Sequence, residues 1–508
     1  MTKAIIMSIA ALGLIVDVGA QDFWRVPLQS EVNSVEPMTG IVFWVGQRTN
    51  TDAIQLEFSY MGYDEVVDAD GHFRWDAVEA VLDSVASRNH QAILRFYYTY
   101  PGQQTTVPDY IKALHDYDEA VGWSEGQKTW YPDWSHPELK RFHLRFYRAF
   151  AERYDGDPRL AFLQTGFGLW AEYHIYDGLY QLGKTFPDEA FQRDFLMLMD
   201  SAFQYTPWSI SIDAADPENG PFDTYPELLS LRFGNFDDSF MAEEHPQVNA
   251  PRWAFFDTLD RYRWAPAGGE FSYYSDYDQM HVLDLPDGAY GISYEEMARR
   301  FSISYMIGND QPDYQPMSRI REASQNTGYH FEIVDFLTRA DSSVVYITNK
   351  GTAPIYYPAF VSVDGVRSAT SVQGLMPGDT LQCGIAAGRA PHEGIPVLRI
   401  ESDFILPTQT IEYDAHILTT HMRDMRPTPK QPRIVLIDHG AARLCQLYWQ
   451  ASPPKKCRIT LTDVGGHVLL SKTTKATSPW PLPPIAGGIY FLKIEWSGGH
   501  SAHRLWIN

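Results

Sequence analysis

Two glutamates stand where a pair of carboxyl groups could carry out chemistry. Glu172 follows the apolar stretch Gly-Leu-Trp-Ala, and Glu270 follows a Gly-Gly pair near the end of another apolar run. Charged side chains are unusual in such runs, because buried strand positions normally take apolar residues. Cleavage of a glycosidic bond needs one carboxylic acid to protonate the leaving oxygen and one carboxylate that faces the anomeric carbon. We therefore predict that Glu172 and Glu270 form a catalytic pair of carboxyl groups.

The sequence around each glutamate fits this division of work. Trp170 and Tyr173 flank Glu172, and apolar surroundings raise the pKa of a carboxyl group, which suits acid/base catalysis. The glycines before Glu270 would permit close approach of the backbone or of a ligand. The alternative is that either glutamate is a salt-bridged residue of the barrel wall.

Other side chains near these positions are candidates for substrate binding. A cation inside a strand could hold the nucleophile ionised and in place, or it could form a structural ion pair. A histidine two residues after Glu172 could contact a sugar hydroxyl or tune that carboxyl group. Aromatic rings could stack on a sugar or belong to the core, and polar residues at strand ends (the pairs at 237–238 and 309–310) could bind hydroxyls or cap a loop. The candidates are Arg95, Tyr97, His174, Trp44, Trp170, Asp237 and Asn309.

Metal and cofactor sites are not expected. The chain has three cysteines, at 383, 445 and 457, and it contains neither Cys-x-x-Cys nor His-Glu-x-x-His. Cys445 and Cys457 are near enough in sequence to bridge neighbouring strands, which would leave Cys383 without a partner.

The elements that must position these residues alternate between apolar runs and amphipathic stretches. Helices are clear at 76–89, 136–154 and 188–203, where apolar residues recur with the 3.6-residue period. Eight runs interleaved with helices predict an α/β fold, a (β/α)₈ TIM barrel, whose active site lies at the C-terminal ends of the strands. A doubly wound open sheet is the alternative. The runs are 40–45, 55–60, 91–100, 160–174, 208–212, 231–240, 264–274 and 301–309. The long aromatic segment 101–134 after the third run is expected to be functional.

After about Tyr329 short alternating strands separated by Gly, Pro and Asn predict an antiparallel β-sandwich. The domains expected are therefore a signal peptide at 1–20, the barrel at 21–330, a β-sandwich at 331–420, a linker at 421–431 and a small C-terminal β domain at 432–508.

The N-terminus and the overall charge indicate where the chain acts. A short basic start, an apolar run from Ala4 to Val16 and small residues up to Ala20 are typical of a secretory signal peptide, so a secreted or cell-surface protein is expected. The formal net charge of −23 argues against nucleic acid and anionic membranes as partners, because it repels phosphate groups.

The barrel resembles the clan-A glycoside hydrolases, in which an acid/base Glu ends strand four and a nucleophile Glu ends strand seven. This resemblance implies those roles for Glu172 and Glu270. Two features differ: that clan usually has Asn before the acid/base, where this chain has Ala171, and its companion arginine lies on strand two, whereas Arg95 falls on the third run.

Residues 40–415 resemble more closely a bacterial family of glycosidase-like proteins catalogued as a domain of unknown function. The stretches 94–102, 153–159 and 168–174 carry this likeness. The last stretch, through 463–468 and 487–494, resembles the C-terminal sorting domain of the type IX secretion system. That resemblance implies the outer-membrane secretion machinery as a partner; an ordinary accessory β-sandwich is the alternative.

These observations predict a secreted, retaining glycoside hydrolase that acts on an oligo- or polysaccharide. A non-catalytic glycan-binding protein on the same barrel is the first alternative. A polysaccharide lyase with a Tyr or His base beside Arg95 is the second, and it would need an acidic sugar as substrate, which the net charge disfavours.

Overall fold

A computed structural model describes residues 23–418, 433–439, 442–448, 455–463, 467–476, 480–483, 488–497 and 499–507. The predicted signal peptide and linker lie outside these residues. The chain divides into two compact units, residues 1–419 and 420–508. No described helix is long and apolar enough to cross a membrane.

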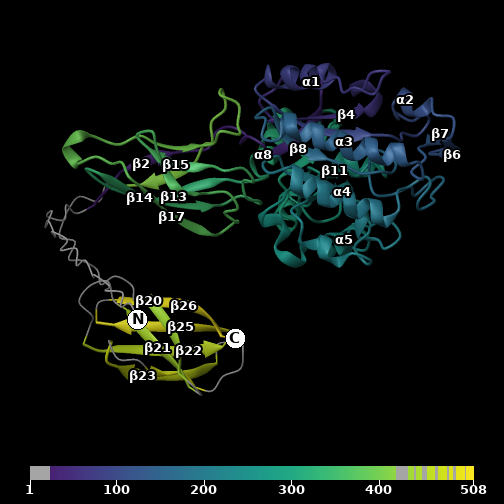
Figure 1. The fold of residues 1–508 in the computed structure, drawn as a ribbon. Helices are drawn as coiled ribbons and strands as arrows, with labels where there is room; N and C mark the ends of the chain where they lie inside the picture. Colours follow the sequence, from purple (N-terminus) through teal and green to yellow (C-terminus); the bar gives the residue numbers. More distant parts are fainter. Residues whose placement is uncertain are drawn as a thin grey trace, which may run out of the picture. The chain divides into compact units, whose positions relative to one another are not determined.

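The first unit contains a closed barrel of eight parallel strands, which confirms the predicted fold class (Figure 1). Each strand is short and almost entirely buried, because both its faces are covered. In chain order the strands are β3 (Gly40–Trp44), β4 (Leu56–Gly62), β5 (Gln91–Tyr97), β8 (Leu160–Gln164), β9 (Trp208–Ser211), β10 (Gly234–Phe240), β11 (Ala267–Phe271) and β12 (Tyr305–Ile307). They follow one another around the barrel, and β12 closes it by pairing with β3.

Helices surround the barrel and bury one apolar face each. On α3, Phe142, Phe146 and Phe150 recur at four-residue spacing and are fully buried in the core between helix and barrel. The helices are α1 (Asp76–Ala86), α2 (Asp109–Lys112), α3 (Pro137–Tyr154), α4 (Glu189–Ala202), α5 (Asn249–Phe256), α6 (Asp276–His281), α7 (Tyr294–Arg300) and α8 (Met317–Gln325). The segment after β5 also forms a hairpin, β6 (Ala120–Ser124) and β7 (Gln127–Tyr131).

Two mainly antiparallel sheets follow the barrel, as predicted, and one of their strand pairs is parallel. One has the order β17-β14-β13-β19-β2, and the other has the order β16-β15-β18. The strands are β13 (Phe331–Arg339), β14 (Ser342–Asn349), β15 (Phe360–Val363), β16 (Val366–Ser371), β17 (Thr380–Ile385), β18 (Leu398–Glu401) and β19 (Asp414–Ile417). The first sheet also takes up β1 (Trp24–Arg25) and β2 (Leu28–Ser30), which pair with β13 and β19. Residues 24–30 thus join the sandwich and not the barrel, to which the sequence assigned them.

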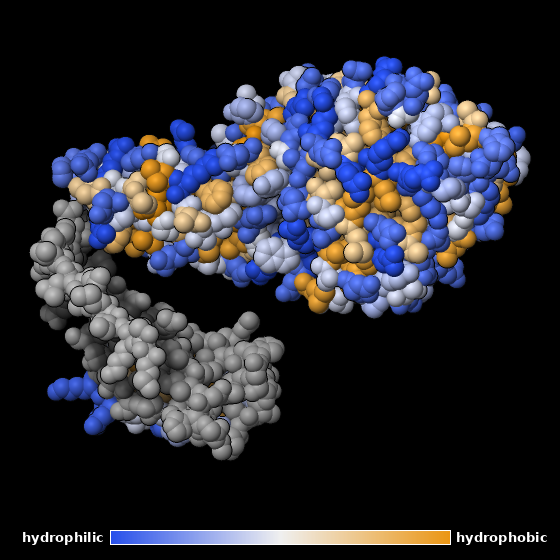
Figure 2. Space-filling view, in the orientation of Figure 1, coloured by the Kyte–Doolittle hydropathy of each residue, from blue (hydrophilic) through white to orange (hydrophobic). Residues whose placement is uncertain are grey.

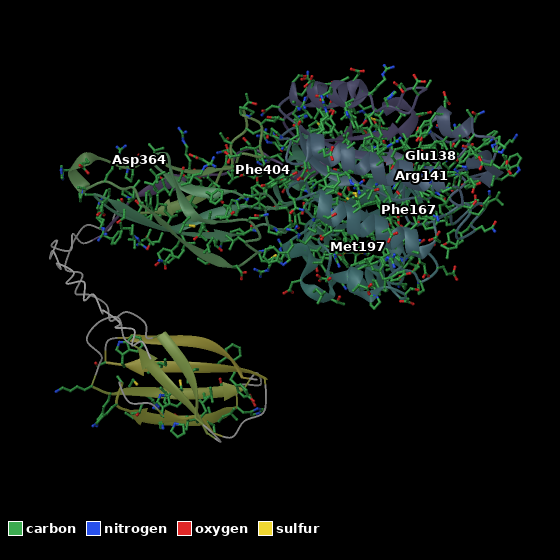
Figure 3. All side chains as sticks on the ribbon, viewed as in Figure 1. Glu138, Arg141, Phe167, Met197, Asp364 and Phe404 are labelled. Carbon is green, nitrogen blue, oxygen red and sulfur yellow. The ribbon has the colours of Figure 1, made fainter. Side chains whose placement is uncertain are left out.

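The sandwich packs directly against the N-terminal ends of the barrel strands. The Tyr357 hydroxyl donates to the backbone oxygens of Leu160 and Ala161 at 3.1 and 2.7 Å. The ring of Phe404, labelled in Figure 3, lies 5.1 Å from that of Tyr205 and 5.2 Å from that of Tyr357. Barrel and sandwich therefore share one hydrophobic core.

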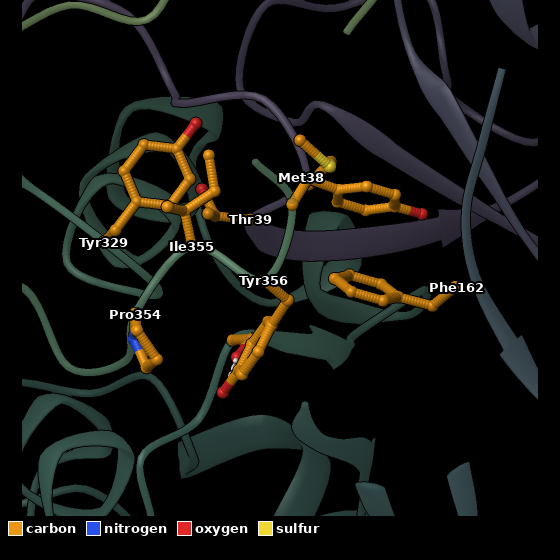
Figure 4. Close-up of a pocket in the computed structure, with 9 residues that line it drawn as sticks. Met38, Thr39, Phe162, Tyr329, Pro354, Ile355 and Tyr356 are labelled. Atoms are coloured by element: carbon orange, nitrogen blue, oxygen red, sulfur yellow. Dashed lines mark hydrogen bonds between the residues drawn. The ribbon is translucent and has the colours of Figure 1, made fainter. Parts of the chain in front are cut away.

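A small void of about 10 Å³ remains in this contact, lined by residues that include Met38, Phe162 and Tyr356 (Figure 4). Its volume is about that of one water molecule, so it is too small for an organic ligand. On the face of the unit that Figure 2 shows, hydrophilic and apolar residues are interspersed.

The second unit has two small antiparallel sheets around a core of its own. The strands are β20 (Arg433–His439), β21 (Ala442–Tyr448), β22 (Cys457–Asp463), β23 (Val468–Thr474), β24 (Trp480–Pro481), β25 (Gly488–Trp496) and β26 (Gly499–Ile507). Cys445 on β21 and Cys457 on β22 belong to different sheets, and both thiols, like that of Cys383, are buried and free among the described residues. The predicted possibility of a bridge between neighbouring strands is therefore wrong for this structure.

Candidate functional site

A cavity of about 560 Å³ opens at the C-terminal ends of the barrel strands. This volume is in the range of small-molecule sites. Its wall comes from residues at or just after strands β3, β4, β5, β8, β10, β11 and β12, so nearly the whole barrel mouth contributes. The lining residues are Trp44, Gln47, Tyr60, Tyr100, Glu125, Trp170, Glu172, Tyr176, Asp238, Glu270, Tyr273, Tyr274, Asn309 and Asp310.

Glu172 reaches the cavity from a tight loop and not from a strand end. The fourth run was expected to continue as a strand to His174, but β8 ends at Gln164. The backbone then folds back on itself, with the amide of Gly168 donating to the oxygen of Glu172 at 2.8 Å. A side chain at Gly168 could not fit, because its Cβ would lie 1.9 Å from the oxygen of His174.

The two residues before Glu172 have left-handed backbone conformations. Trp170 has φ = +53° and Ala171 has φ = +59°, a region that costs a non-glycine residue roughly 1–2 kcal/mol. Such strain persists only where the surrounding structure enforces it, and it is concentrated at functional sites. The loop thus expends folding energy to aim Glu172 into the barrel mouth.

Arg95 and His174 hold both carboxylate oxygens of Glu172. Nη1 of Arg95 donates to Oε1 of Glu172 at 2.7 Å, and Nε2 of His174 lies 2.9 Å from Oε2. The side chain of Glu172 is only 3% exposed and that of Arg95 is 0% exposed. The sequence allowed Arg95 to hold the nucleophile or to form a structural ion pair; the structure pairs it with Glu172 and not with Glu270.

Arg95 is itself fixed deep in the barrel. Its Nε donates to Oε1 of Gln164 at 2.8 Å, and Nη1 also donates to the Tyr60 hydroxyl at 3.0 Å. The guanidinium carbon lies 4.2 Å from the centre of the Phe236 ring. These contacts hold the positive charge of Arg95 beside Glu172.

Glu270 lies on β11 and is held less tightly. Its side chain is half-buried and lines the cavity, and the structure gives it no hydrogen bond or ion pair with any described residue. The glycines before it make room for the neighbouring strands: a Cβ on Gly268 would meet the Tyr305 ring at 2.3 Å, and one on Gly269 would meet the oxygen of Asp237 at 2.1 Å. The groups that approach these glycines closely are therefore neighbouring strands of the protein, one of the two possibilities that the sequence left open.

The pKa values of both glutamates are raised. Burial raises the pKa of Glu172 to about 7, with a further contribution from Asp238, while His174 and Arg95 oppose the rise. Burial raises the pKa of Glu270 to about 8, Arg95 opposes this, and Glu172 and Asp238 add to it. Two like charges in one poorly solvated cavity disfavour double ionisation, so near neutral pH the pair holds about one proton.

A second group of charges lies behind Glu172. Nε2 of His174 lies 3.5 Å from Oδ2 of Asp238, and Arg252 donates to Oδ1 of Asp213 at 2.7 Å. Burial lowers the pKa of His174, but Asp213, Asp238 and Glu172 raise it well above its usual value. Burial also disfavours ionisation of Asp238, yet its hydrogen bond with His174 brings its pKa down to about 2.

The same group offers the donor atoms that a metal ion would need. Glu172, His174, Asp213 and Asp238 each present one ligand atom, all within 4.8 Å of one another. However, Arg95 and Arg252 already pair with two of the three carboxylates, and a charged His174 balances the third. A divalent cation would meet the fixed positive charges of Arg95 and Arg252 there, so the donor set fits a network of ion pairs better than a metal site.

The other predicted residues divide between the wall and the interior. Trp44, Trp170 and Asn309 line the cavity, and Oδ1 of Asn309 accepts from the backbone amide of Trp44 at 3.1 Å. Tyr97 lies behind Tyr100, with ring centres 5.8 Å apart, and is not among the lining residues.

Asp237 is fully buried away from the cavity, where Asn249 and Trp253 donate to its carboxylate at 2.7 and 2.9 Å. Its neighbour Asp238 faces the cavity instead. Successive side chains of a strand point to opposite faces, so of this pair only Asp238 faces the cavity.

Sequence reasoning missed several wall residues. Tyr60, Tyr100, Tyr176, Tyr273 and Tyr274 give the cavity much of its aromatic surface, and Tyr176 and Tyr274 are each 65% exposed. Trp170 and Tyr176 stack with ring centres 6.1 Å apart and planes at 22°. An available signal was that most of these tyrosines end, or closely follow, a predicted strand run.

The comparisons with known proteins give no family for the chain. No protein-family model matches, and no curated protein matches. Among solved structures, the chain is similar to a glycoside hydrolase family 30 subfamily 8 xylanase from Clostridium acetobutylicum, with 10% identity, 71% of this chain and 98% of that chain covered, and a TM-score of 0.30.

Two endoglucanases give similar values. A GH5-4 broad-specificity endoglucanase from an uncultured bacterium has 10% identity, covers 61% of this chain and 100% of its own, and has a TM-score of 0.32. The endoglucanase Cel5A of Pseudomonas stutzeri has 12% identity, covers 59% and 97%, and has a TM-score of 0.31. Scores at this level assign neither activity nor substrate.

Proposed function

We propose that this protein hydrolyses glycosidic bonds, with Glu172 and Glu270 as its catalytic carboxyl groups. The observation that carries the proposal is that both glutamates line one cavity at the C-terminal end of the barrel and that both have raised pKa values, to about 7 and about 8. A pair that shares one proton near neutral pH supplies both forms that glycoside hydrolysis needs, a proton donor and a carboxylate.

The lining of the cavity supports a sugar as substrate. Exposed tyrosines and Trp170 offer ring faces, and Gln47, Asn309 and Asp310 offer hydrogen-bonding groups for hydroxyls. Sites of this kind combine apolar ring surface with a few convergent polar groups.

The charge of the cavity narrows the class of sugar. Five of its lining residues are acidic (Glu125, Glu172, Asp238, Glu270 and Asp310), and none is Lys, Arg or His. Such a wall repels uronic acids and sulfated sugars, so we propose an uncharged glycoside as substrate. This argues against the lyase alternative, which needs an acidic sugar and a cation facing it, because the charge of Arg95 is already paired with Glu172.

Glycan binding without hydrolysis is the second candidate. The ion pair between Arg95 and Glu172 favours it, because a carboxylate held by two partners could serve only to shape the pocket. Against it, both glutamates line the cavity, and Glu270 makes no hydrogen bond or ion pair with any described residue.

A panel of aryl glycosides and polysaccharides separates these candidates. Hydrolysis predicts new reducing ends or released aryl groups from neutral substrates, with no rise in ultraviolet absorbance from unsaturated sugars. Release of products from uronic-acid polysaccharides, together with a rise in ultraviolet absorbance from unsaturated sugars, would identify a lyase. Retention of glycans on the immobilised protein without any product would identify a binding protein.

We further propose that the chain is exported and that residues 432–508 direct it to the outer-membrane secretion machinery. The apolar segment before Ala20 and the resemblance of the last stretch to sorting domains support this proposal. Expression in a bacterium with this secretion system tests it: the mature surface protein should begin at Gln21, and deletion of 432–508 should leave the protein in the periplasm.

A further inference from the structure

The two carboxyl groups of the site are held in very different ways. Glu172 accepts hydrogen bonds on both oxygens, from Arg95 on one and from His174 on the other. Arginine remains protonated in proteins, and charge-assisted hydrogen bonds of this kind favour the ionised carboxylate and fix its orientation. Glu172 is therefore held in a fixed orientation by two partners that oppose the rise in its pKa.

His174 strengthens this environment. Three carboxylates, from Asp213, Asp238 and Glu172, surround the imidazole, and its Nδ1 has no hydrogen-bond partner among the described residues. Because those negative charges favour the protonated ring, Glu172 faces two cations. A proton on Glu172 would have to share an oxygen with one of these two donors.

Glu270 has the opposite environment. Glu172, Asp238 and Asp310 raise its pKa, and Arg95 opposes this rise through its charge while it forms its ion pair with Glu172. Its side chain is half-buried on the wall of the cavity and makes no hydrogen bond with any described residue. A group in these surroundings tends to hold a proton and can rotate to deliver it.

We infer that the two groups divide the work in the reverse of the order that the clan-A resemblance implies: Glu172 is the nucleophile and Glu270 is the acid/base. The inference rests on the proposed hydrolase function. It also explains why the arginine of this chain lies on β5, since β5 pairs with β8 and thereby reaches the loop that carries Glu172.

The steps balance as follows for a retaining hydrolysis. An oxygen of Glu172 bonds to the anomeric carbon while the bond to the leaving oxygen breaks, and that oxygen takes the proton of Glu270. A water molecule then attacks the anomeric carbon, gives a proton back to Glu270 and releases the sugar from Glu172. The net change is the addition of one water across the glycosidic bond.

Covalent trapping in the wild-type enzyme tests the inference without any variant. The probe is the 2-deoxy-2-fluoro sugar, with a dinitrophenyl leaving group, that corresponds to the best aryl glycoside of the panel. Peptide mapping by mass spectrometry should find the sugar on Glu172. A label on Glu270, or an active enzyme that accumulates no label, would overturn the reversed assignment and leave the hydrolase proposal intact.

Variants supply the second readout. Each variant is assayed on substrates with a dinitrophenyl leaving group and with poorer leaving groups. Glu270→Ala should keep much of the wild-type kcat on the dinitrophenyl substrate. Azide should restore its activity and give a glycosyl azide of retained configuration. Glu172→Ala should lose at least about 10³-fold on every substrate, and azide should give the inverted product. The opposite pattern overturns the inference.

Glu152→Ala is the control, because Glu152 is an exposed glutamate on α3 that does not line the cavity. Its dependence of kcat on the leaving group and its response to azide should be those of the wild type. If all three variants hydrolyse as fast as the wild type, the two glutamates are not the catalytic pair, and if the wild type itself releases no product, the hydrolase proposal fails; both results differ from a reversed azide pattern. Thermal unfolding of each variant identifies any loss caused by misfolding.

Discussion

Replacing Glu270 by Gln should make the protein more stable at neutral pH, by an amount that depends on pH. Burial raises the pKa of Glu270 from 4.5 to about 8. For a group whose pKa is higher in the folded state, the stability present below pH 4.5 is lost as the pH rises through the folded-state value. An amide of the same shape does not titrate, so the variant escapes that loss.

The magnitude follows from the linkage relation. With pKa values of 4.5 unfolded and about 8 folded, ionisation of Glu270 costs the folded state about 3 kcal/mol at pH 7 and less than about 1 kcal/mol at pH 5. These are upper bounds, because the side chain is half-buried and water reaches it through the cavity.

Urea denaturation followed by tryptophan fluorescence at pH 5 and pH 8 measures the effect. The free energy of unfolding of Glu270→Gln should exceed that of the wild type at pH 8 and lie close to it at pH 5. Glu125→Gln, which alters an exposed carboxylate of the same cavity, should differ little from the wild type at either pH. A gain for Glu270→Gln that is the same at both values, or larger at pH 5, would refute the claim that burial raises the pKa of Glu270.

Three further perturbations test other parts of the site. Arg95→Met should destabilise the protein by about 3–5 kcal/mol in denaturation experiments, because it leaves the buried carboxylate of Glu172 unpaired; in Glu172→Gln the same change should have a smaller effect, and equal losses would mean that the pair is not coupled. Ala171→Gly should leave the free energy of unfolding nearly unchanged, because relief of the positive φ offsets the loss of a buried methyl group. Ala161→Gly in β8 should lower the free energy of unfolding by about 1–2 kcal/mol more, and equal losses in the two variants would contradict strain at Ala171. Tyr274→Ala should raise KM for long oligosaccharides more than for short aryl glycosides with kcat little changed, and an equal change in both would exclude Tyr274 as a stacking surface for distant sugar units.

The architecture could be predicted because its signals are local. Periodic apolar residues in each run and helix specify strands and helices, and their alternation specifies the barrel. What escaped prediction depends on contacts between distant residues. Residues 24–30 join the sandwich by pairing with strands more than 300 residues away, and no pattern within so short a segment indicates this.

The site was predictable to the level of the glutamate pair but not of its partners. The apolar stretch before Glu172 resembles a strand, yet it folds back because Gly168 lets the backbone approach itself and because Trp170 and Ala171 accept positive φ. This fold brings Glu172 onto Arg95. A partner chosen by the path of a strained loop cannot be inferred from spacing alone, which is why the sequence left the role of Arg95 open.

The most direct test of the account is kcat/KM on the best neutral substrate of the panel for the wild type, Glu172→Gln, Glu270→Gln and the control Glu125→Gln. On substrates with poor leaving groups, kcat/KM should fall at least about 10²–10³-fold when either glutamate is replaced and should change only a few-fold in the control. Activity in Glu172→Gln or Glu270→Gln equal to that of the control would contradict the account.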